Sequence, residues 1–399
     1  MTGGILITNG FVHAIARRGS IYLSLDRLDA AWRFLVTFIV AGFLFAVAVA
    51  AITFAVVTRL AIMPPEPPFI CAVALGALSM LWLLGAGLSL VGQTEWLGIA
   101  LAAGLLAGVG FNASLEPYIA AHLAIATIIG FVTIVTVLLG ALWMAYGQEA
   151  RRQPGRHRLT LPTAGFVVQE ALPYFWYGLL YMLFVLVPHV LGWAGIIERE
   201  QERLSVITHF ELGMTAALIP FMLVGGIAEH ALHLFWQVIG SALKTTPATD
   251  RQRFNHVLRH HYRWQLTIYL VALTAVSVVG YAVFQSCLDR GLLSSWLPSA
   301  NADNVTFVFL VSLAAYWLLG WGVFNCVHLI TLAQPVRAAW CVGIGIAVLV
   351  VGGVPLTLVY GFMAAPVAWV GAGLAFVVTS SWAATGLLHS ADYYLAASL

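Results

Sequence analysis

The chain has 399 residues, of which 61% are hydrophobic and 9% charged, and its formal net charge is +2. A water-soluble globular domain carries about 25% charged residues, so this composition excludes a soluble protein and predicts surroundings that are mostly lipid. Cys71, Cys287, Cys326 and Cys341 show no CxxC spacing, which supports neither a disulfide framework nor a zinc ribbon.

Ten segments are long and apolar enough to cross a membrane, which takes about 20 mostly apolar residues. Only short polar stretches separate the second from the third and the third from the fourth, which predicts two tight hairpins. We therefore expect an all-α fold, a polytopic membrane protein of two helical bundles with four and six spans. In chain order the predicted spans are 31–60, 69–91, 97–115, 118–146, 170–195, 207–235, 262–286, 304–332, 337–360 and 364–390.

The basic residues predict the orientation of these spans. If the N-terminus is cytoplasmic, 14 of the 18 Lys and Arg residues fall on the cytoplasmic side. Only Arg59, Arg199, Arg203 and Arg290 are left on the other side. Because cytoplasmic loops of membrane proteins carry an excess of Lys and Arg, we expect both termini to be cytoplasmic.

Two segments between the predicted spans are expected to be cytoplasmic, and the first of them divides the chain into two lobes. Residues 148–169, rich in Arg with Pro and Gly, predict a linker between an N-terminal lobe (1–147) and a C-terminal lobe (170–399). Residues 249–266 have apolar residues at three- and four-residue spacing with Arg between them, which predicts an amphipathic helix on the inner leaflet. Its basic side suits anionic lipid or a partner.

Two acidic residues of the sixth predicted span are candidates for a substrate pathway. Glu211 and Glu229 are 18 residues apart, about five turns, so a regular helix places both on one face. Pro220 and the pair Gly225-Gly226 predict a break between them, and broken helices line transport pathways. The alternative is that both carboxylates lie at headgroup depth and contact water.

The stretch "GGIAEHALHLFW" (225–236) places His230 and His233 beside Glu229. Such a group is compatible with a metal site, a proton relay, a substrate site or the polar end of a membrane helix. The zinc pattern HExxH has its histidines at i and i+4, whereas these are at i and i+3 with no evident third ligand. We therefore expect no metal site, and we take Glu229 as the residue to test.

Further candidates come from aromatic and amide side chains. Tyr174, Tyr177 and Tyr181 belong to an aromatic cluster that opens the fifth span. Such a cluster is typical of the aromatic belt at membrane surfaces, and it also suits stacking against sugar rings. Asn325 in the eighth span predicts either an interhelical hydrogen bond or a pore-lining group.

Several motifs resemble one known family. "LPYFWYGLLYMLFVL" followed by "FELGMTAALIPFMLVGGIAE", the pair "ALSMLWLLGAGLSLVGQTEWLGIAL", "FNHVLRHHYRWQL" and the terminal "LLHSADYYLAAS" are similar to the PelG-like inner-membrane transporters of the Pel exopolysaccharide. More distantly, the chain is similar to the MATE-like flippases of polysaccharide export. The resemblance covers most of the chain from about residue 10. Such transporters carry two six-helix lobes, so we expect the first helical hairpin to be missing.

The resemblance implies a bacterial inner-membrane location and outward transport of a hexosamine-rich polymer. It also implies a cytoplasmic glycosyltransferase that feeds the polymer, and inner-membrane regulatory subunits. Alternatives are a flippase for lipid-linked oligosaccharide and a degenerate transporter that acts as a membrane scaffold for a synthase. The sequence has no GxxxxGK[ST] and no Rossmann fingerprint, so we do not expect ATP-driven transport by this chain alone. An intramembrane enzyme is the last alternative, because no convergent nucleophile or metal set is evident. We expect no cofactor, no enzymatic activity and no nucleic-acid partner.

Overall fold

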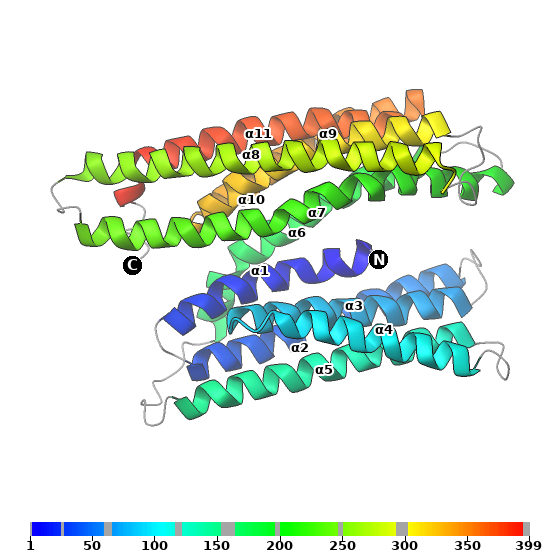
Figure 1. Ribbon diagram of the computed structural model, residues 1–399, viewed down its shortest axis with the longest axis horizontal. Helices are drawn as coiled ribbons and strands as arrows, with labels where there is room; N and C mark the ends of the chain where they lie inside the picture. Colours follow the sequence, from blue (N-terminus) through cyan, green and yellow to red (C-terminus); the bar gives the residue numbers. More distant parts are fainter. Residues whose placement is uncertain are drawn as a thin grey trace. The chain divides into compact units, whose positions relative to one another are not determined.

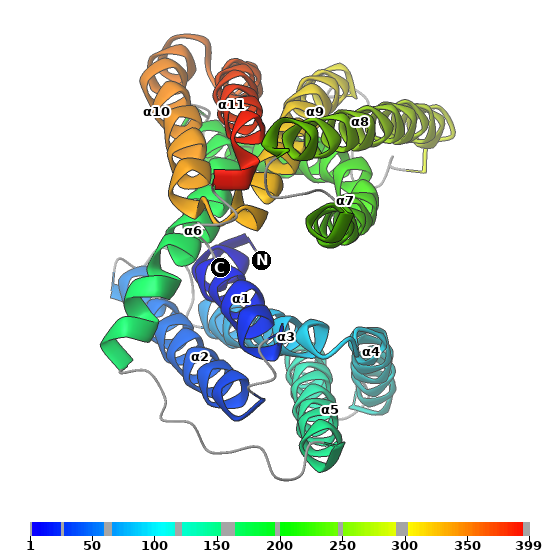
Figure 2. The ribbon, with the colours of Figure 1, turned by 90° about the vertical axis from the view of Figure 1, so that its left-hand side faces the viewer.

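The computed structural model describes residues 2–24, 28–59, 66–115, 122–152, 164–195, 200–245, 250–292 and 302–393, and these ranges are helical apart from short turns (Figure 1). The chain divides into two compact units, Met1–Met182 and Leu183–Leu399. The boundary lies inside one helix, α6 (Ala164–Ala194). In Figure 2 the helices of each unit are seen roughly end-on.

Besides α6, the helices described in the first unit are α1 (Thr2–Ser24), α2 (Leu28–Arg59), α3 (Glu66–Leu90), α4 (Glu95–Leu115) and α5 (His122–Arg152). Those described in the second unit are α7 (Glu200–Thr245), α8 (Arg251–Asp289), α9 (Ala302–Thr331), α10 (Pro335–Tyr360) and α11 (Ala364–His389). In the second unit α9 packs against α7, α8, α10 and α11 and is therefore its central helix.

The ten helices α2 to α11 are long and apolar enough to cross a membrane. They correspond one to one with the ten predicted spans, so the all-α polytopic fold class is confirmed and the chain is a multi-pass membrane protein. The stretch before the first predicted span also forms a helix: α1 packs against α2 and α3 in the first unit.

Three predictions about continuity need correction. Helix α7 is unbroken through Pro220, so it is not interrupted as predicted. Pro173 and Pro188 likewise predict a broken helix in the fifth span, but α6 is unbroken through both. The linker predicted at 148–169 is shorter, because α5 continues to Arg152 and α6 begins at Ala164. Its middle part lies outside the described residues.

The predicted surface helix over 249–266 is instead the first part of α8, which begins at Arg251. Asp250 caps it, since its side chain accepts a hydrogen bond from the backbone N–H of Arg253 (3.2 Å). The apolar face is buried within the second unit through Phe254, Leu258 and Tyr262. This face is therefore used in packing the unit and is not available for insertion into lipid.

Hydroxyl side chains in the apolar helices bond to their own backbone. Thr133 donates to the carbonyl of Ile129 (2.9 Å), and Thr357 donates to that of Gly353 (2.7 Å). Both follow the i to i−4 pattern of Ser and Thr inside helices. Because lipid offers no hydrogen-bond partners, this bonding explains how polar residues are accommodated in these spans.

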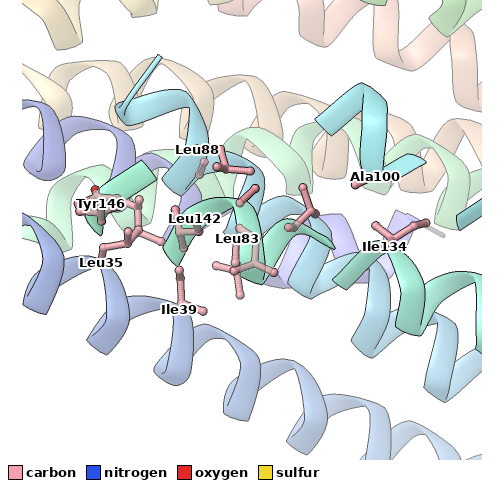
Figure 3. Close-up of a cluster of buried hydrophobic side chains, with 13 residues drawn as sticks. Leu35, Ile39, Leu83, Leu88, Ala100, Ile134, Leu142 and Tyr146 are labelled. Carbon is pink, nitrogen blue, oxygen red and sulfur yellow. The ribbon is translucent and has the colours of Figure 1, made fainter. Parts of the chain in front are cut away.

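The first unit is held by an aliphatic core with one polar-tipped ring at its edge (Figure 3). Leu35 and Ile39 of α2 lie among side chains of α3 and α5, which include Leu83, Leu142 and Tyr146. The connection from α3 to α4 is short because Gly92 adopts φ of +70°, a left-handed conformation that suits glycine at a helix C-terminus. The predicted short connection between these two spans is thereby confirmed, but α3 and α4 barely pack against each other, and α4 packs against α5 instead.

Helices α4 and α5 approach each other through glycine. Gly104 and Gly108 form a GxxxG pair in α4 and face Gly130 of α5. A Cβ atom added to Gly130 would lie 2.9 Å from the carbonyl oxygen of Gly104. Small residues that allow backbones to come together are a common basis of helix association in membranes.

We expect Gly130→Ala to destabilise the protein, because the new methyl group meets backbone that cannot rotate away. Overpacking of this kind costs about 1–3 kcal/mol, which corresponds to a melting temperature lower by about 2 °C or more. Gly140→Ala is the matched control in the same helix, since a Cβ there meets nothing within 4 Å. Thermal unfolding of the detergent-solubilised variants measures the difference, and equal melting temperatures would contradict the assigned contact.

Candidate functional site

The predicted site residues are divided between the two units. Tyr174, Tyr177 and Tyr181 are in the first unit, whereas Glu211, Glu229 and Asn325 are in the second. Each group is described within its own unit. How these residues take part in a substrate pathway stays a prediction.

Glu211 forms a polar cluster with two side chains of α6. The Nδ1 atom of His189 lies 2.9 Å from Oε1 and 3.1 Å from Oε2 of Glu211. The indole Nε1–H of Trp193 donates to Oε1 at 2.8 Å. Because an ionised carboxylate only accepts hydrogen bonds, His189 is assigned the tautomer with hydrogen on Nδ1. We call these three residues the Glu211 cluster.

Local geometry explains why the Glu211 cluster forms. His189 and Trp193 are four residues apart and share one face of α6. Between them, Gly192 has no Cβ, and a Cβ there would lie only 2.2–2.9 Å from ring atoms of Phe210. The glycine thus admits the Phe210 ring and brings this part of α7 close to the end of α6. Glu211, the next residue, then meets His189 and Trp193.

The Glu211 cluster is only partly enclosed. His189 is 5% exposed, whereas the side chain of Glu211 is 29% exposed. A carboxylate has about four lone-pair directions, and the donors found are one imidazole N–H and one indole N–H. The carboxylate can therefore accept further hydrogen bonds from its exposed side.

Glu229 lies far from the Glu211 cluster on the same helix. With α7 unbroken, 18 residues at about 1.5 Å each place the two backbones about 27 Å apart along the axis. At this separation the two acids cannot contact one ligand of ordinary size. The side chains of Glu229 and His233 lie outside the described residues; that of His230 is exposed.

No group of three His, Cys, Asp or Glu side chains positioned to hold a metal ion occurs among the residues that were searched, which are those the structure describes. The Glu211 cluster itself contains one carboxylate and one imidazole, so it falls short of the ligand number of a structural zinc site.

The three tyrosines of α6 do not form an exposed aromatic surface, because two of them are buried. Tyr174 and Tyr177 are 7% and 1% exposed. The Tyr177 ring contacts His13 of α1 edge-on, with centroids 5.2 Å apart, and it is nearly parallel to the ring of Tyr181 at 6.4 Å. Close packing continues at Gly178, whose carbonyl accepts a hydrogen bond from Asn9 (2.8 Å). Of the three, Tyr181 alone is partly exposed.

Asn325 is the centre of a buried network between three helices. Tyr262 of α8 donates its O–H to Asn325 Oδ1 at 2.7 Å. Asn325 Nδ2 donates to the hydroxyl oxygens of Ser380 (3.1 Å) and Ser381 (2.9 Å) of α11. Asn325 is 0% exposed. Of the two alternatives predicted for it, the structure shows the interhelical hydrogen bond.

Several buried polar side chains near Asn325 use only part of their hydrogen-bonding capacity. Gln265 donates to the carbonyl of Ala231 of α7 (2.7 Å), and His328 Nδ1 lies 2.9 Å from the carbonyl of Phe324. The buried atoms Gln265 Oε1, His261 Nε2 and His328 Nε2 have no hydrogen-bond partner among the described residues. The interior of the second unit therefore contains several polar side chains, although the helices that form it are apolar in sequence.

Comparisons with known proteins identify the fold and leave the family open. No family model matches the sequence, and no curated protein matches it. Solved structures of MATE transporters do match over nearly the whole chain at 11–15% identity. This identity is low enough that the likeness shows the fold alone.

Three of these structures illustrate the likeness. A mutant of the Vibrio cholerae MATE transporter VcmN has a TM-score of 0.65 at 15% identity, covering 97% of this chain and 87% of that chain. An outward-facing multidrug resistance MATE transporter of the MOP superfamily has 0.65 at 12%, covering 98% and 86%. The MATE transporter ClbM in complex with Rb⁺ has 0.60 at 13%, covering 96% and 87%.

We expect the hydrogen bond between Tyr262 and Asn325 to stabilise the second unit. A double-mutant cycle with Tyr262→Phe and Asn325→Val should give a coupling of about 1 kcal/mol. Tyr281→Phe on the same helix is the control, since Tyr281 is 38% exposed, and its coupling with Asn325→Val should be near zero. Equilibrium unfolding in detergent measures both cycles, and equal couplings would contradict the network.

Proposed function

We propose that this protein moves a hexosamine-rich exopolysaccharide outward across the bacterial inner membrane. A MATE-type fold over almost the whole chain supports membrane transport, but a fold alone does not determine an activity. The substrate class is supported by the resemblance of five sequence stretches to PelG-like transporters. The observation that carries the proposal is the Glu211 cluster.

The Glu211 cluster supports transport because a carboxylate in an apolar span is costly to keep. Intramembrane acids are rare and mark substrate or ion pathways. Glu211 is the third residue of the apolar span His209–Ala242. It is held by an imidazole and an indole, with no Lys or Arg ion pair recorded for it in the described part of the chain.

The chemistry of the Glu211 cluster suits amino sugars. An ammonium group can pair with the Glu211 carboxylate, for which the described residues record no Lys or Arg partner, and sugar hydroxyls can donate to its remaining lone pairs. His189 and Trp193 hold the carboxylate in one orientation, so a ligand meets a fixed acceptor. The indole of Trp193, which is 37% exposed, adds an apolar ring face against which a sugar can stack.

Of the three tyrosines that the sequence predicts in the substrate pathway, the proposal keeps one. Tyr174 and Tyr177 are buried, so a sugar reaches them only if α1 and α6 separate. Tyr181, partly exposed, is the tyrosine that we propose to contact polymer. We further propose a cytoplasmic glycosyltransferase and inner-membrane regulatory subunits as partners, on the sequence resemblance.

We expect Glu211→Gln to reduce polymer secretion by roughly tenfold or more, the effect of losing about 1.4 kcal/mol of charge-dependent interaction. The amide keeps the shape and one acceptor, so the protein should remain in the membrane at its normal amount. Asp303→Asn removes an exposed carboxylate from the first turn of α9, and it should leave secretion unchanged. Secreted polymer, measured alongside membrane protein level in a deletion strain carrying each variant, tests this.

The same strains separate the alternative functions. If polymer accumulates on a lipid carrier when the protein is absent, the protein is a flippase for lipid-linked oligosaccharide. If Glu211→Gln secretes normally while deletion of residues 153–163 abolishes synthase recruitment, the protein is a scaffold. Loss of secretion with unlinked polymer retained in the cytoplasm is the outcome that the transport proposal requires.

A further inference from the structure

The first third of α8 has a basic face that other described residues leave uncovered. Arg253, His256, His260 and Arg263 are all exposed, and their spacing of three, four and three residues places them on one side of the helix. No ion pair with a described residue is recorded for any of the four. We call these four residues the α8 basic face.

The opposite side of α8 contacts Asp392, just past the end of α11. Asn255 donates to Asp392 Oδ1 at 2.8 Å and to the carbonyl of His389 at 3.1 Å. Arg251 lies 3.8 Å from Asp392 Oδ2. Arg251 therefore helps to join α8 to the end of α11, whereas the α8 basic face is not needed for this contact.

The α8 basic face continues directly into an apolar stripe. Trp264 follows Arg263 and is 61% exposed, and Ile268, Val271 and Val278 on the same side are 45%, 64% and 62% exposed. Large apolar side chains exposed in this way face hydrocarbon in a membrane-spanning helix. One side of α8 thus changes from cationic to apolar at a tryptophan, the residue typical of the membrane interface.

The length of α8 allows this change to lie at headgroup depth. At about 1.5 Å per residue its 39 residues extend about 58 Å, against about 30 Å of hydrocarbon. If hydrocarbon begins near Trp264, Arg263 and His260 lie within about 6 Å of that boundary along the axis, and His256 and Arg253 within about 17 Å. The flexible Arg side chains can reach back to the phosphates from there.

We propose that the α8 basic face, together with Trp264, binds the headgroups of anionic phospholipid. Guanidinium groups pair with phosphate through two parallel hydrogen bonds. The occupant has to be anionic beside Arg263 and aliphatic beside Ile268 and Val271, only a few residues along the same face. A phospholipid has both parts in this order, whereas an acidic protein or a nucleic acid would leave the apolar stripe without a partner.

The test compares lipid binding by the purified full chain in detergent micelles. Binding of phosphatidylglycerol and of phosphatidylcholine with identical acyl chains is counted by native mass spectrometry. We expect the wild type to prefer phosphatidylglycerol, and Arg253→Gln with Arg263→Gln to weaken that preference roughly tenfold to thirtyfold, since each surface arginine contributes about 1 kcal/mol near anionic lipid. Arg253→Lys with Arg263→Lys should keep most of the preference.

Two controls make the outcome specific. Arg290→Gln removes an exposed arginine at the other end of α8 and should keep the preference. Arg251→Gln removes an exposed arginine from the opposite side of α8, where it contacts Asp392, and should also keep the preference. The proposal is overturned if the wild type shows no preference, if the double glutamine variant retains it, or if Arg290→Gln loses it equally. The result depends on α8 crossing a membrane and is independent of the transported substrate.

Discussion

Every backbone N–H and C=O group of a membrane span must be bonded inside the protein, because hydrocarbon offers no partner. This constraint accounts for the uniformly helical structure of the described residues. It also extends to side chains: Thr133 and Thr357 bond to their own helices, and Asn325 bonds to two neighbouring ones. Polar residues in the spans whose hydrogen bonds are not all satisfied inside the protein are candidates for a functional role.

The lack of hydrogen-bond partners in hydrocarbon also explains why a cluster of only three residues can determine how α6 and α7 associate. Apolar contact gives spans little net attraction in lipid, so close packing and polar bonds determine how they associate. Gly192 allows the Phe210 ring to approach α6, and the approach lets His189 and Trp193 hold Glu211. A feature of packing thereby produces a fixed acceptor with an exposed side, which is what a transporter needs for a cationic, hydroxyl-rich solute.

The sequence predicted the number and approximate bounds of the spans, because about 20 consecutive apolar residues are a strong local signal. It failed where tertiary contacts override local patterns. Pro220 is accommodated inside α7, and the amphipathic pattern at 249–266 reflects packing in the second unit, since Leu258 and Tyr262 are buried there. The contact between His189 and Glu211 could not be predicted, since it depends on how α6 and α7 pack against each other. The spacing of His189 and Trp193, four residues apart in an apolar run, did indicate that both lie on one face of the helix.

The central claim, that this protein transports amino-sugar polymer and that Glu211 is part of the path, is tested most directly by counterflow in vesicles containing only the purified chain. Vesicles preloaded with an unlabelled hexosamine oligomer are diluted into the labelled oligomer, so no energy source has to be known. The account predicts a transient accumulation of label with the wild type that largely disappears with Glu211→Gln. Accumulation no greater than in protein-free vesicles, or equal accumulation with both proteins, would contradict it.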